Sequence, residues 1–455
     1  MIKKRKSFAV NLILIMILTF AGMHVIDDLT IAAENKSIPE YNYKQFELEN
    51  GFEVYVMEDD SIPVINYYLY YDVGSIDEKS GQTGISHFLE HMMFLESENL
   101  DKGEFNDIIN EIGGKSNAMT TYDYTTYYGE VSDNMLEMIM ALESERMINL
   151  EFDSAEVERE RGVLVQERKT RIMSNVFSRN LEKIKAKAFK NTALEHQVVG
   201  WMEDIKSISS EELKAYYEKY YSPNNAVLVL SGDVDSAEVF QLAKKYFGDF
   251  KASDIEGENE VEEKSWEFKA GKELNLKDNT QVPIIMMLYN IPEGNHSDQV
   301  AIESLLDILV NNRSSRVKSK LQRDKRLIIE TGSFNIKLEV PGFALIYLVP
   351  TNQMNLNEAQ KAFDAEIERI INNGLKEEEL EIIKNNELKT TNFNQRNSKT
   401  MAKFLGLGAS NYNNPGFYSK YVESVYNLTE NDIIEVAKKY FDPDNRVIGN
   451  IIPDN

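Results

Sequence analysis

A segment of this sequence recurs 220 positions further along the chain, the first copy covering residues 209–227 and the second residues 429–447. Each copy begins with a hydroxyl residue and a helix-like run, continues through a proline-initiated turn and ends in an apolar strand-like run. Matching at a constant offset over this length is not expected by chance. We therefore predict that the chain contains two homologous domains.

An acidic, polar stretch separates the two predicted domains. We place the first domain at residues 34–250, the linker at 251–265 and the second domain at 266–455. Strand-like runs open the first domain, at Phe52–Met57 and Val64–Tyr71, and long charged helical segments follow. Strands grouped with helices in this way are typical of an α+β fold, in which helices pack against a sheet.

His87, Glu90 and His91 form the pattern H-x-x-E-H, which reverses the order of the HExxH zinc signature. Residues four apart lie on the same face of an α-helix, so both imidazoles could bind one divalent ion. Glu90 would lie at the edge of that face, within reach of a water molecule beside the ion. The alternative interpretation is two helix-surface histidines with a carboxylate between them by chance.

A catalytic zinc ion usually takes three protein ligands, so a third ligand must come from elsewhere in the chain. The charged, helix-like segment Glu156–Glu167 contains Glu160 and Glu167, which lie two helical turns apart on one face. One of them could bind the metal while the other hydrogen-bonds a ligating histidine. Their spacing does not distinguish the two roles, and a helix rich in Glu and Arg can equally be a solvated face.

The segment Gly84–Phe94 resembles the active-site helix of the pitrilysin/insulysin metallopeptidases, a family that includes the mitochondrial processing peptidase. Three further segments are similar to later blocks of that family and follow in the family's order: Gly113–Thr120, His196–Gly200 and Tyr221–Val227. The resemblance implies one zinc ion per chain. It also implies that the third ligand is Glu167, 76 positions after His91.

The resemblance further implies an architecture and a reaction. Each domain would be an antiparallel sheet with helices packed on one face, and the two domains would form half of a clamshell. The reaction would be zinc-dependent hydrolysis of peptide bonds, with Glu90 as base and then acid, and with Glu160 hydrogen-bonded to a ligand. Asn117 and Ala118 would hold the peptide substrate through main-chain hydrogen bonds to an added strand. Without the resemblance, these two residues fit an ordinary entry into a strand.

One family feature is missing from the second half. Active members carry an arginine and a tyrosine seven residues apart, in a run that resembles Ser315–Ile329, but the corresponding positions here hold Gln322 and Ile329. The second domain also lacks H-x-x-E-H, so we expect it to serve as a substrate wall and dimer contact. The chain resembles the zinc-bearing half of a heterodimer whose second half-length subunit supplies the Arg/Tyr pair. An active homodimer and a non-catalytic assembly subunit are the alternatives.

The N-terminus has the pattern of an export signal. Basic residues at positions 3–6 precede an apolar run from Phe8 to Met23, so residues 1–33 are predicted to be a signal peptide or an uncleaved membrane anchor. We therefore expect an extracytoplasmic location, which is secreted, cell-surface or periplasmic. The chain has no cysteine, which excludes disulfide bonds. Its 75 acidic and 50 basic side chains give a net charge of −25, which argues against nucleic acid as a partner.

Overall fold

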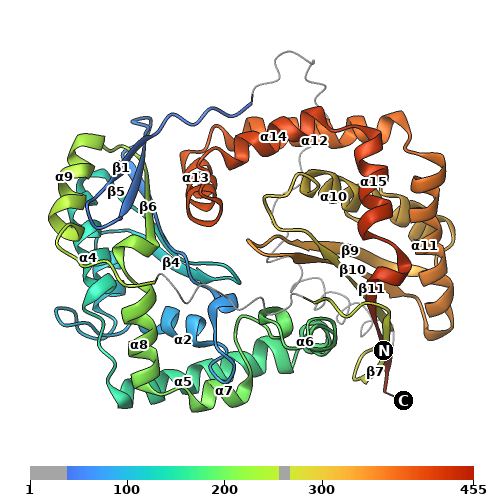
Figure 1. Ribbon diagram of the computed structural model, residues 1–455, viewed down its shortest axis with the longest axis horizontal. Helices are drawn as coiled ribbons and strands as arrows, with labels where there is room; N and C mark the ends of the chain where they lie inside the picture. Colours follow the sequence, from blue (N-terminus) through green and yellow to red (C-terminus); the bar gives the residue numbers. More distant parts are fainter. Residues whose placement is uncertain (1–37, 256–266, 455) are drawn as a thin grey trace, which may run out of the picture. The chain divides into compact units, whose positions relative to one another are not determined.

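The computed structural model describes residues 38–255 and 267–454, which form two β-sheets surrounded by helices (Figure 1). The predicted signal peptide or anchor at residues 1–33 lies outside the described residues, and so does most of the predicted linker at 251–265. Within the described part of the chain, none of the helices has both the length and the apolar character that crossing a membrane requires.

The first sheet has six strands, of which all neighbours are antiparallel except β2 and β6. The strands are β1 (Lys44–Glu47), β2 (Glu53–Glu58), β3 (Val64–Tyr71), β4 (Lys115–Thr120), β5 (Thr125–Ser132) and β6 (Ala226–Gly232). Their spatial order is β1-β2-β6-β3-β5-β4. The central strand β3 is buried along almost its whole length because both of its faces are covered. β4 is an edge strand, so one side of its backbone has no strand partner among the described residues.

Helices of the first half pack mainly on one face of this sheet. They are α2 (Ile85–Met92), α3 (Glu104–Glu111), α4 (Leu136–Ile148), α5 (Ser154–Arg168), α6 (Val176–Ala188), α7 (Met202–Ser207), α8 (Ser210–Tyr220) and α9 (Ser236–Phe247). A π-helical turn, Lys169–Met173, follows α5 directly. The core beneath these helices is built from apolar residues of the sheet together with α2, α4, α8 and α9.

The second sheet has five strands in the order β7-β11-β8-β10-β9, and only β7 and β11 pair in parallel. The strands are β7 (Lys272–Asp278), β8 (Ile284–Ile291), β9 (Ile328–Ile336), β10 (Gly342–Pro350) and β11 (Arg446–Pro453). The helices of this half are α10 (Gln299–Leu306), α11 (Leu356–Asn373), α12 (Glu377–Asn394), α13 (Ser398–Tyr412), α14 (Phe417–Asn427) and α15 (Glu430–Tyr440).

The two copies of the sequence repeat adopt the same local structure. Ser209 caps α8 and Thr429 caps α15, each through a reciprocal pair of hydrogen bonds with the third helical residue. A short 3-10 turn beginning at proline then leads into β6 or β11. Both strands occupy the same position in their sheets, beside the strand with which they pair in parallel. The predicted α+β fold with two related sheets is therefore confirmed.

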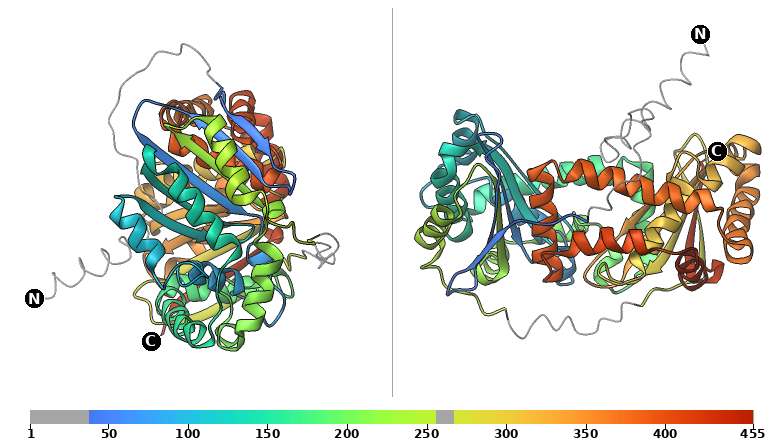
Figure 2. Two further views of the ribbon diagram at one scale, coloured as in Figure 1. Left: turned by 90° about the vertical axis from the view of Figure 1, so that its left-hand side faces the viewer. Right: turned by 90° about the horizontal axis from the view of Figure 1, so that it is seen from above.

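The second face of each sheet is covered by a helix from the other half of the chain, a feature that the sequence did not predict. α13 places Leu405 and its neighbours against Tyr70 and Val229 of the first sheet, and Figures 1 and 2 agree in showing α13 beside that sheet. α6 places Ile184 against the second sheet. Glycine permits this contact, because a Cβ atom at Gly449 would lie 2.1 Å from Cδ1 of Ile184. Each sheet therefore has its second face covered by a helix from the opposite half of the chain.

We predict that Ile184→Ala lowers the free energy of unfolding by about 2–5 kcal/mol, because it opens a cavity between α6 and the second sheet. Ile184 has no exposed surface. The matched control is Ile62→Ala, since Ile62 is 55% exposed and its loss should change the free energy by less than about 0.5 kcal/mol. Urea unfolding followed by circular dichroism measures both values. Equal effects of the two substitutions would contradict this account of α6.

Candidate metal centre

His87, Glu90 and His91 lie on α2, which is fixed in place by its packing on the core. Ile85, Phe88, Leu89 and Met92 face inward and are almost completely buried. The helix starts after Gly84, whose φ of 89° is a left-handed conformation that glycine adopts without strain. His87 is 7% exposed, so its imidazole is shielded from bulk water. The two imidazole rings are 4.8 Å apart between centroids.

α5 brings Glu160 and Glu167 to the same place. Asp153 caps α5 by accepting hydrogen bonds from the backbone N–H groups of Ala155 and Glu156. Glu167 Oε2 lies 3.8 Å from His87 Nε2 and 3.3 Å from His91 Nε2. One ligand atom from each of these three residues lies within 4.8 Å of the other two. The three residues that sequence reasoning selected as metal ligands therefore converge.

The separations suit a tetrahedral zinc ion. Ligand atoms about 2.0–2.1 Å from zinc at tetrahedral angles are about 3.3–3.4 Å from one another. The two carboxylate–imidazole distances, 3.3 and 3.8 Å, are close to that value. Two imidazole nitrogens and one carboxylate oxygen are also a ligand set that catalytic zinc sites use, with the fourth position left for water. The residues present fit a zinc ion.

Glu160 and Glu167 contact different nitrogens of His91. This contact distinguishes the two glutamates, whereas their spacing in the sequence did not show which could bind the metal and which could orient the histidine. Glu160 Oε1 lies 2.7 Å from Nδ1 of His91, on the side of the ring away from the cluster of ligand atoms. Glu167 faces Nε2 of both histidines and also pairs with Arg171, whose Nη1 lies 2.8 Å from its Oε1. Glu160 can thus orient the ring while Glu167 remains available as a ligand.

The protonation of the metal-free cluster follows from burial and charge. Burial lowers the pKa of His87 to about 4, so its imidazole is neutral at pH 7 and has a free lone pair. Burial also disfavours charge on His91 and on Glu167, but their mutual hydrogen bond and charges outweigh it. The pKa of His91 therefore rises to about 9, the hydrogen bond with Glu160 being the largest cause that raises it, and the pKa of Glu167 falls to about 2.

Glu90 lies beside the cluster and is hydrogen-bonded to the edge strand. The hydroxyl of Thr120, the last residue of β4, donates to Oε2 of Glu90. Burial raises the pKa of Glu90 above its ordinary value, which brings it closer to the working pH of a general base. Asn117 and Ala118 lie on the same strand, and the carboxamide oxygen of Asn117 accepts a hydrogen bond from the backbone N–H of Ala118.

Thr120, Arg171 and Glu78 belong to the surroundings of the site and were not selected from the sequence. Arg171 is four residues after Glu167, a spacing that predicts an ion pair on a helix and could have identified it. Thr120 ends a segment that resembles a family block, but nothing in that segment marks its hydroxyl. Glu78 hydrogen-bonds the start of α2 across a loop, and no local pattern indicates such a contact.

The segment Ser315–Ile329, which lacks the Arg/Tyr pair, makes a hydrogen bond within itself. Gln322 donates from its carboxamide to the backbone oxygen of Ile329 at 2.6 Å, so the two positions are neighbours. Arg316 earlier in the run is engaged by Glu379, whose Oε1 lies 2.8 Å from its Nε. Neither position 322 nor position 329 carries a cation or a phenol.

We predict that zinc binding at pH 7 releases about one proton, because an ion that binds Nε2 of His91 must displace the proton which the raised pKa places there. The apparent affinity should therefore rise with pH up to about 9. Calorimetric titration in two buffers of different ionisation enthalpy measures the proton count. Glu160→Gln removes a cause of the raised pKa and should reduce proton release. The same count in this variant, or a pH-independent affinity, would contradict the assignment.

Comparisons with known proteins find relatives that match both halves of the chain. A family model described as "Insulinase (Peptidase family M16)" matches residues 54–200, and one described as "Peptidase M16 inactive domain" matches residues 207–387. The zinc protease PqqE of Helicobacter pylori is 29% identical over 398 residues, which cover 87% of this chain and 89% of PqqE. The crystal structure of a protease from Helicobacter pylori has a TM-score of 0.85 at 27% identity and covers 92% of this chain and 100% of that one.

The probable zinc protease PqqL of Escherichia coli is 26% identical over 405 residues, so 84% of this chain spans only 42% of PqqL. The crystal structure of the first half of that periplasmic protease shares the fold, with a TM-score of 0.72 at 21% identity over 91% of this chain and 92% of that one. The two family models together match most of residues 54–387, and the relatives extend over most of the chain. The chain therefore belongs to the insulinase-type peptidase family M16.

Proposed function

We propose that the chain is a zinc-dependent endopeptidase that binds one zinc ion through His87, His91 and Glu167. The observation that carries the proposal is the convergence of these three side chains with Glu90 next to them. The names of the relatives PqqE and PqqL, both zinc proteases, support the same reaction class. A buried imidazole that stays neutral and a carboxylate that stays ionised are the protonation states that ligands need.

Each side chain around the proposed zinc ion has a separate role in hydrolysis. When bound, zinc lowers the pKa of a water molecule and polarises the scissile carbonyl group. Glu90 accepts the proton of the attacking water and later delivers it to the leaving amine. The hydroxyl of Thr120 holds the Glu90 carboxylate in place, and Glu160 holds the His91 ring.

The free edge of β4 would receive the substrate. A peptide that adds as a further strand makes main-chain hydrogen bonds, which accept many side-chain sequences. Asn117 and Ala118 lie on this edge strand, and Thr120 of the same strand contacts Glu90. A peptide bound along β4 would therefore run past the proposed general base. This arrangement favours extended peptides or unfolded segments as substrates.

Replacing the base should separate metal binding from catalysis. Glu90→Gln keeps the size of the side chain and removes the proton acceptor, so the variant should bind about one zinc per chain while hydrolysis falls about 10²–10⁴-fold. His91→Ala should lose both zinc and activity. Glu111→Gln, an exposed glutamate at the end of α3, is the control and should behave as the parent. Elemental analysis and a fluorogenic peptide assay measure the two properties, in the presence of any partner subunit. Parental hydrolysis by Glu90→Gln would remove Glu90 from the mechanism.

We further propose that the active enzyme is a heterodimer in which a second half-length subunit supplies the missing Arg/Tyr pair. Gln322 and Ile329 cannot provide the cationic and phenolic donors that the family pair would contribute, and Gln322 already donates within the chain. PqqL is more than twice as long as the part this chain matches, so one chain of that relative has room for both halves. The two subunits would close around a chamber that admits peptides and unfolded segments but excludes folded proteins.

The isolated chain should bind zinc yet hydrolyse peptides poorly. Removing donors that stabilise a transition state costs rate, about 10²–10³-fold for one hydrogen-bond donor, while the metal site stays intact. The measurement is peptidase activity of the zinc-loaded chain after size-exclusion chromatography, with and without a half-length family subunit that carries the pair. Robust turnover by the pure single chain would contradict the heterodimer and indicate an active homodimer. Inactivity with every such subunit, despite full zinc loading, would indicate a non-catalytic assembly subunit.

We also propose that the protein works outside the cytoplasm. The support is the signal-like pattern in residues 1–33 and the periplasmic location of the relative PqqL. The absence of cysteine means that the fold depends on its apolar cores in an oxidising compartment, and the cores of both halves are extensive.

A further inference from the structure

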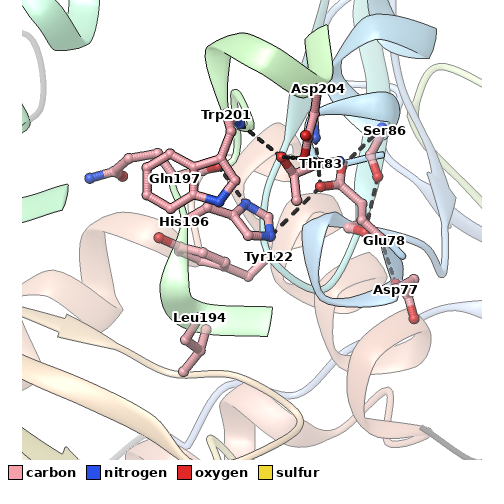
Figure 3. Close-up of polar contacts among 12 residues, drawn as sticks. Asp77, Glu78, Thr83, Ser86, Tyr122, Leu194, His196, Gln197, Trp201 and Asp204 are labelled. Carbon is pink, nitrogen blue, oxygen red and sulfur yellow. Dashed lines mark hydrogen bonds and ion pairs between the residues drawn. The ribbon is translucent and has the colours of Figure 1, made fainter. Parts of the chain in front are cut away.

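The N-terminus of α2 is held by Glu78, a buried carboxyl group six residues before Gly84, the residue that precedes the helix (Figure 3). Oε2 of Glu78 accepts the backbone N–H of Gly84 at 2.7 Å, and Oε1 accepts that of Ser86 at 3.0 Å. The first N–H groups of a helix have no acceptor within the helix, so an external acceptor stabilises this end. An acidic group is also favoured there by the helix dipole. The side chain of Glu78 has no exposed surface.

Neighbouring contacts fix the same end of the helix from two other sides. The hydroxyl of Thr83 donates to Asp204 at 2.6 Å and accepts the backbone N–H of Trp201 at 2.8 Å. The hydroxyl of Ser86 donates to the backbone oxygen of Gly74 at 3.0 Å and lies 2.8 Å from the hydroxyl of Tyr216 on α8. Figure 3 shows Glu78, Thr83 and Ser86 gathered at the start of α2. Movement of this end would break several hydrogen bonds at once.

His196 lies close to Glu78, but it neither hydrogen-bonds nor forms an ion pair with that residue. Nε2 of His196 lies 4.0 Å from Oε2 of Glu78, beyond hydrogen-bond range. Burial lowers the pKa of His196 to about 4, so the imidazole is neutral at pH 7 and forms no ion pair. Its Nδ1 bonds the backbone oxygen of Gln197 at 2.9 Å instead. The partners of Glu78 are therefore the N–H groups of α2.

The anchoring matters most for His87, the residue after Ser86. His91 is oriented by Glu160 at its Nδ1, whereas Nδ1 of His87 is buried and has no hydrogen-bond partner among the described residues. A ligating histidine is usually oriented by a hydrogen bond from its second ring nitrogen. Because the His87 ring has no such bond within residues 38–255 and 267–454, its direction depends on the position of the backbone that carries it.

We propose that Glu78 is a positioning residue that fixes the N-terminus of α2 and thereby aims His87 at the metal. The inference rests on the proposed function, since it assigns His87 as a ligand, but the hold of Glu78 on α2 can be tested without metal. The two oxygens of Glu78 accept separate N–H groups, and both are full acceptors in the ionised form, which predominates above its raised pKa of about 8. Glutamine offers one acceptor and would turn its NH₂ group toward the second backbone N–H, so Glu78→Gln removes one bond and adds a donor–donor contact.

The first test is hydrogen exchange of the metal-free protein. In Glu78→Gln, amides of residues 84–92 should exchange about tenfold faster, the effect of losing about 1.4 kcal/mol of local stability. Glu58→Gln is the matched control, because Glu58 Oε1 accepts the backbone N–H of Ser236 at the start of α9, at 2.9 Å. That variant should accelerate exchange in α9 and leave α2 unchanged. Parental exchange in α2, or acceleration throughout the molecule, would overturn the proposal.

The second test is metal affinity, measured by competition with a chelator and by the absorption spectrum of the cobalt-substituted protein. Glu78→Gln should weaken zinc binding about 10–100-fold and shift the cobalt spectrum, while Glu58→Gln should change the affinity less than about twofold. Altered α2 exchange with parental zinc affinity would overturn the link to His87. If the parent chain binds no zinc, the proposed function fails, and the exchange measurement still decides whether Glu78 holds α2.

A second variant covers the case in which Glu78→Gln does not fold. Thr83→Val keeps the shape of the side chain and removes the hydroxyl bonds to Asp204 and Trp201. It should accelerate exchange in residues 84–92 and weaken zinc binding, both by smaller factors than the Glu78 substitution. Parental exchange and affinity in a folded Thr83→Val protein would overturn the proposal on its own.

Discussion

The contact between α2 and α5 determines what the rest of this molecule must support. It brings three carboxyl groups, Glu90, Glu160 and Glu167, to two histidines in a partly buried place where like charges repel strongly. In the metal-free protein this charge is offset by Arg171 and by a protonated His91. A divalent ion that displaces the His91 proton brings the formal charge of these groups to zero. The concentration of negative charge in this cluster therefore favours a divalent cation.

Two patterns in the amino-acid sequence were sufficient to predict much of this site and fold. The H-x-x-E-H spacing predicted that His87 and His91 share a helix face, and the recurrence of residues 209–227 predicted two related sheets. The choice between Glu160 and Glu167 was different, because both lie on one face of α5. The family resemblance implied Glu167 as the ligand, and the position of α2 supports that proposal, since Glu160 reaches Nδ1 of His91 and Glu167 reaches Nε2. The contact of Glu78 with the start of α2 spans only a short loop, but no local pattern marks it, so it was not predictable.

Local sequence patterns also did not predict that α6 and α13 each pack on the sheet of the other half. This packing has a consequence for the second domain. α6 covers the second sheet and α13 covers the first, so neither half can bury both faces of its sheet alone. A second half without metal ligands therefore still contributes one layer of the first half's packing. Lys185 of α6 extends this dependence, because its ammonium group donates to the backbone oxygen of His196 at 2.6 Å, in the loop that hydrogen-bonds Thr83.

Ionisable groups that are costly to bury are concentrated around α2. Burial raises the pKa of Glu78 to about 8 and lowers that of Lys185 to about 7, because the protein interior disfavours the charged form of each group. An apolar residue in either place would be easier to bury, but it could not accept two helix N–H groups or bind a carbonyl oxygen. Hydrogen-bonded polar groups in a core restrict the backbone to one arrangement, whereas apolar contacts tolerate small shifts. The metal site proposed between α2 and α5, which are far apart in the sequence, would need that restriction, because errors of a fraction of an ångström in ligand position weaken binding.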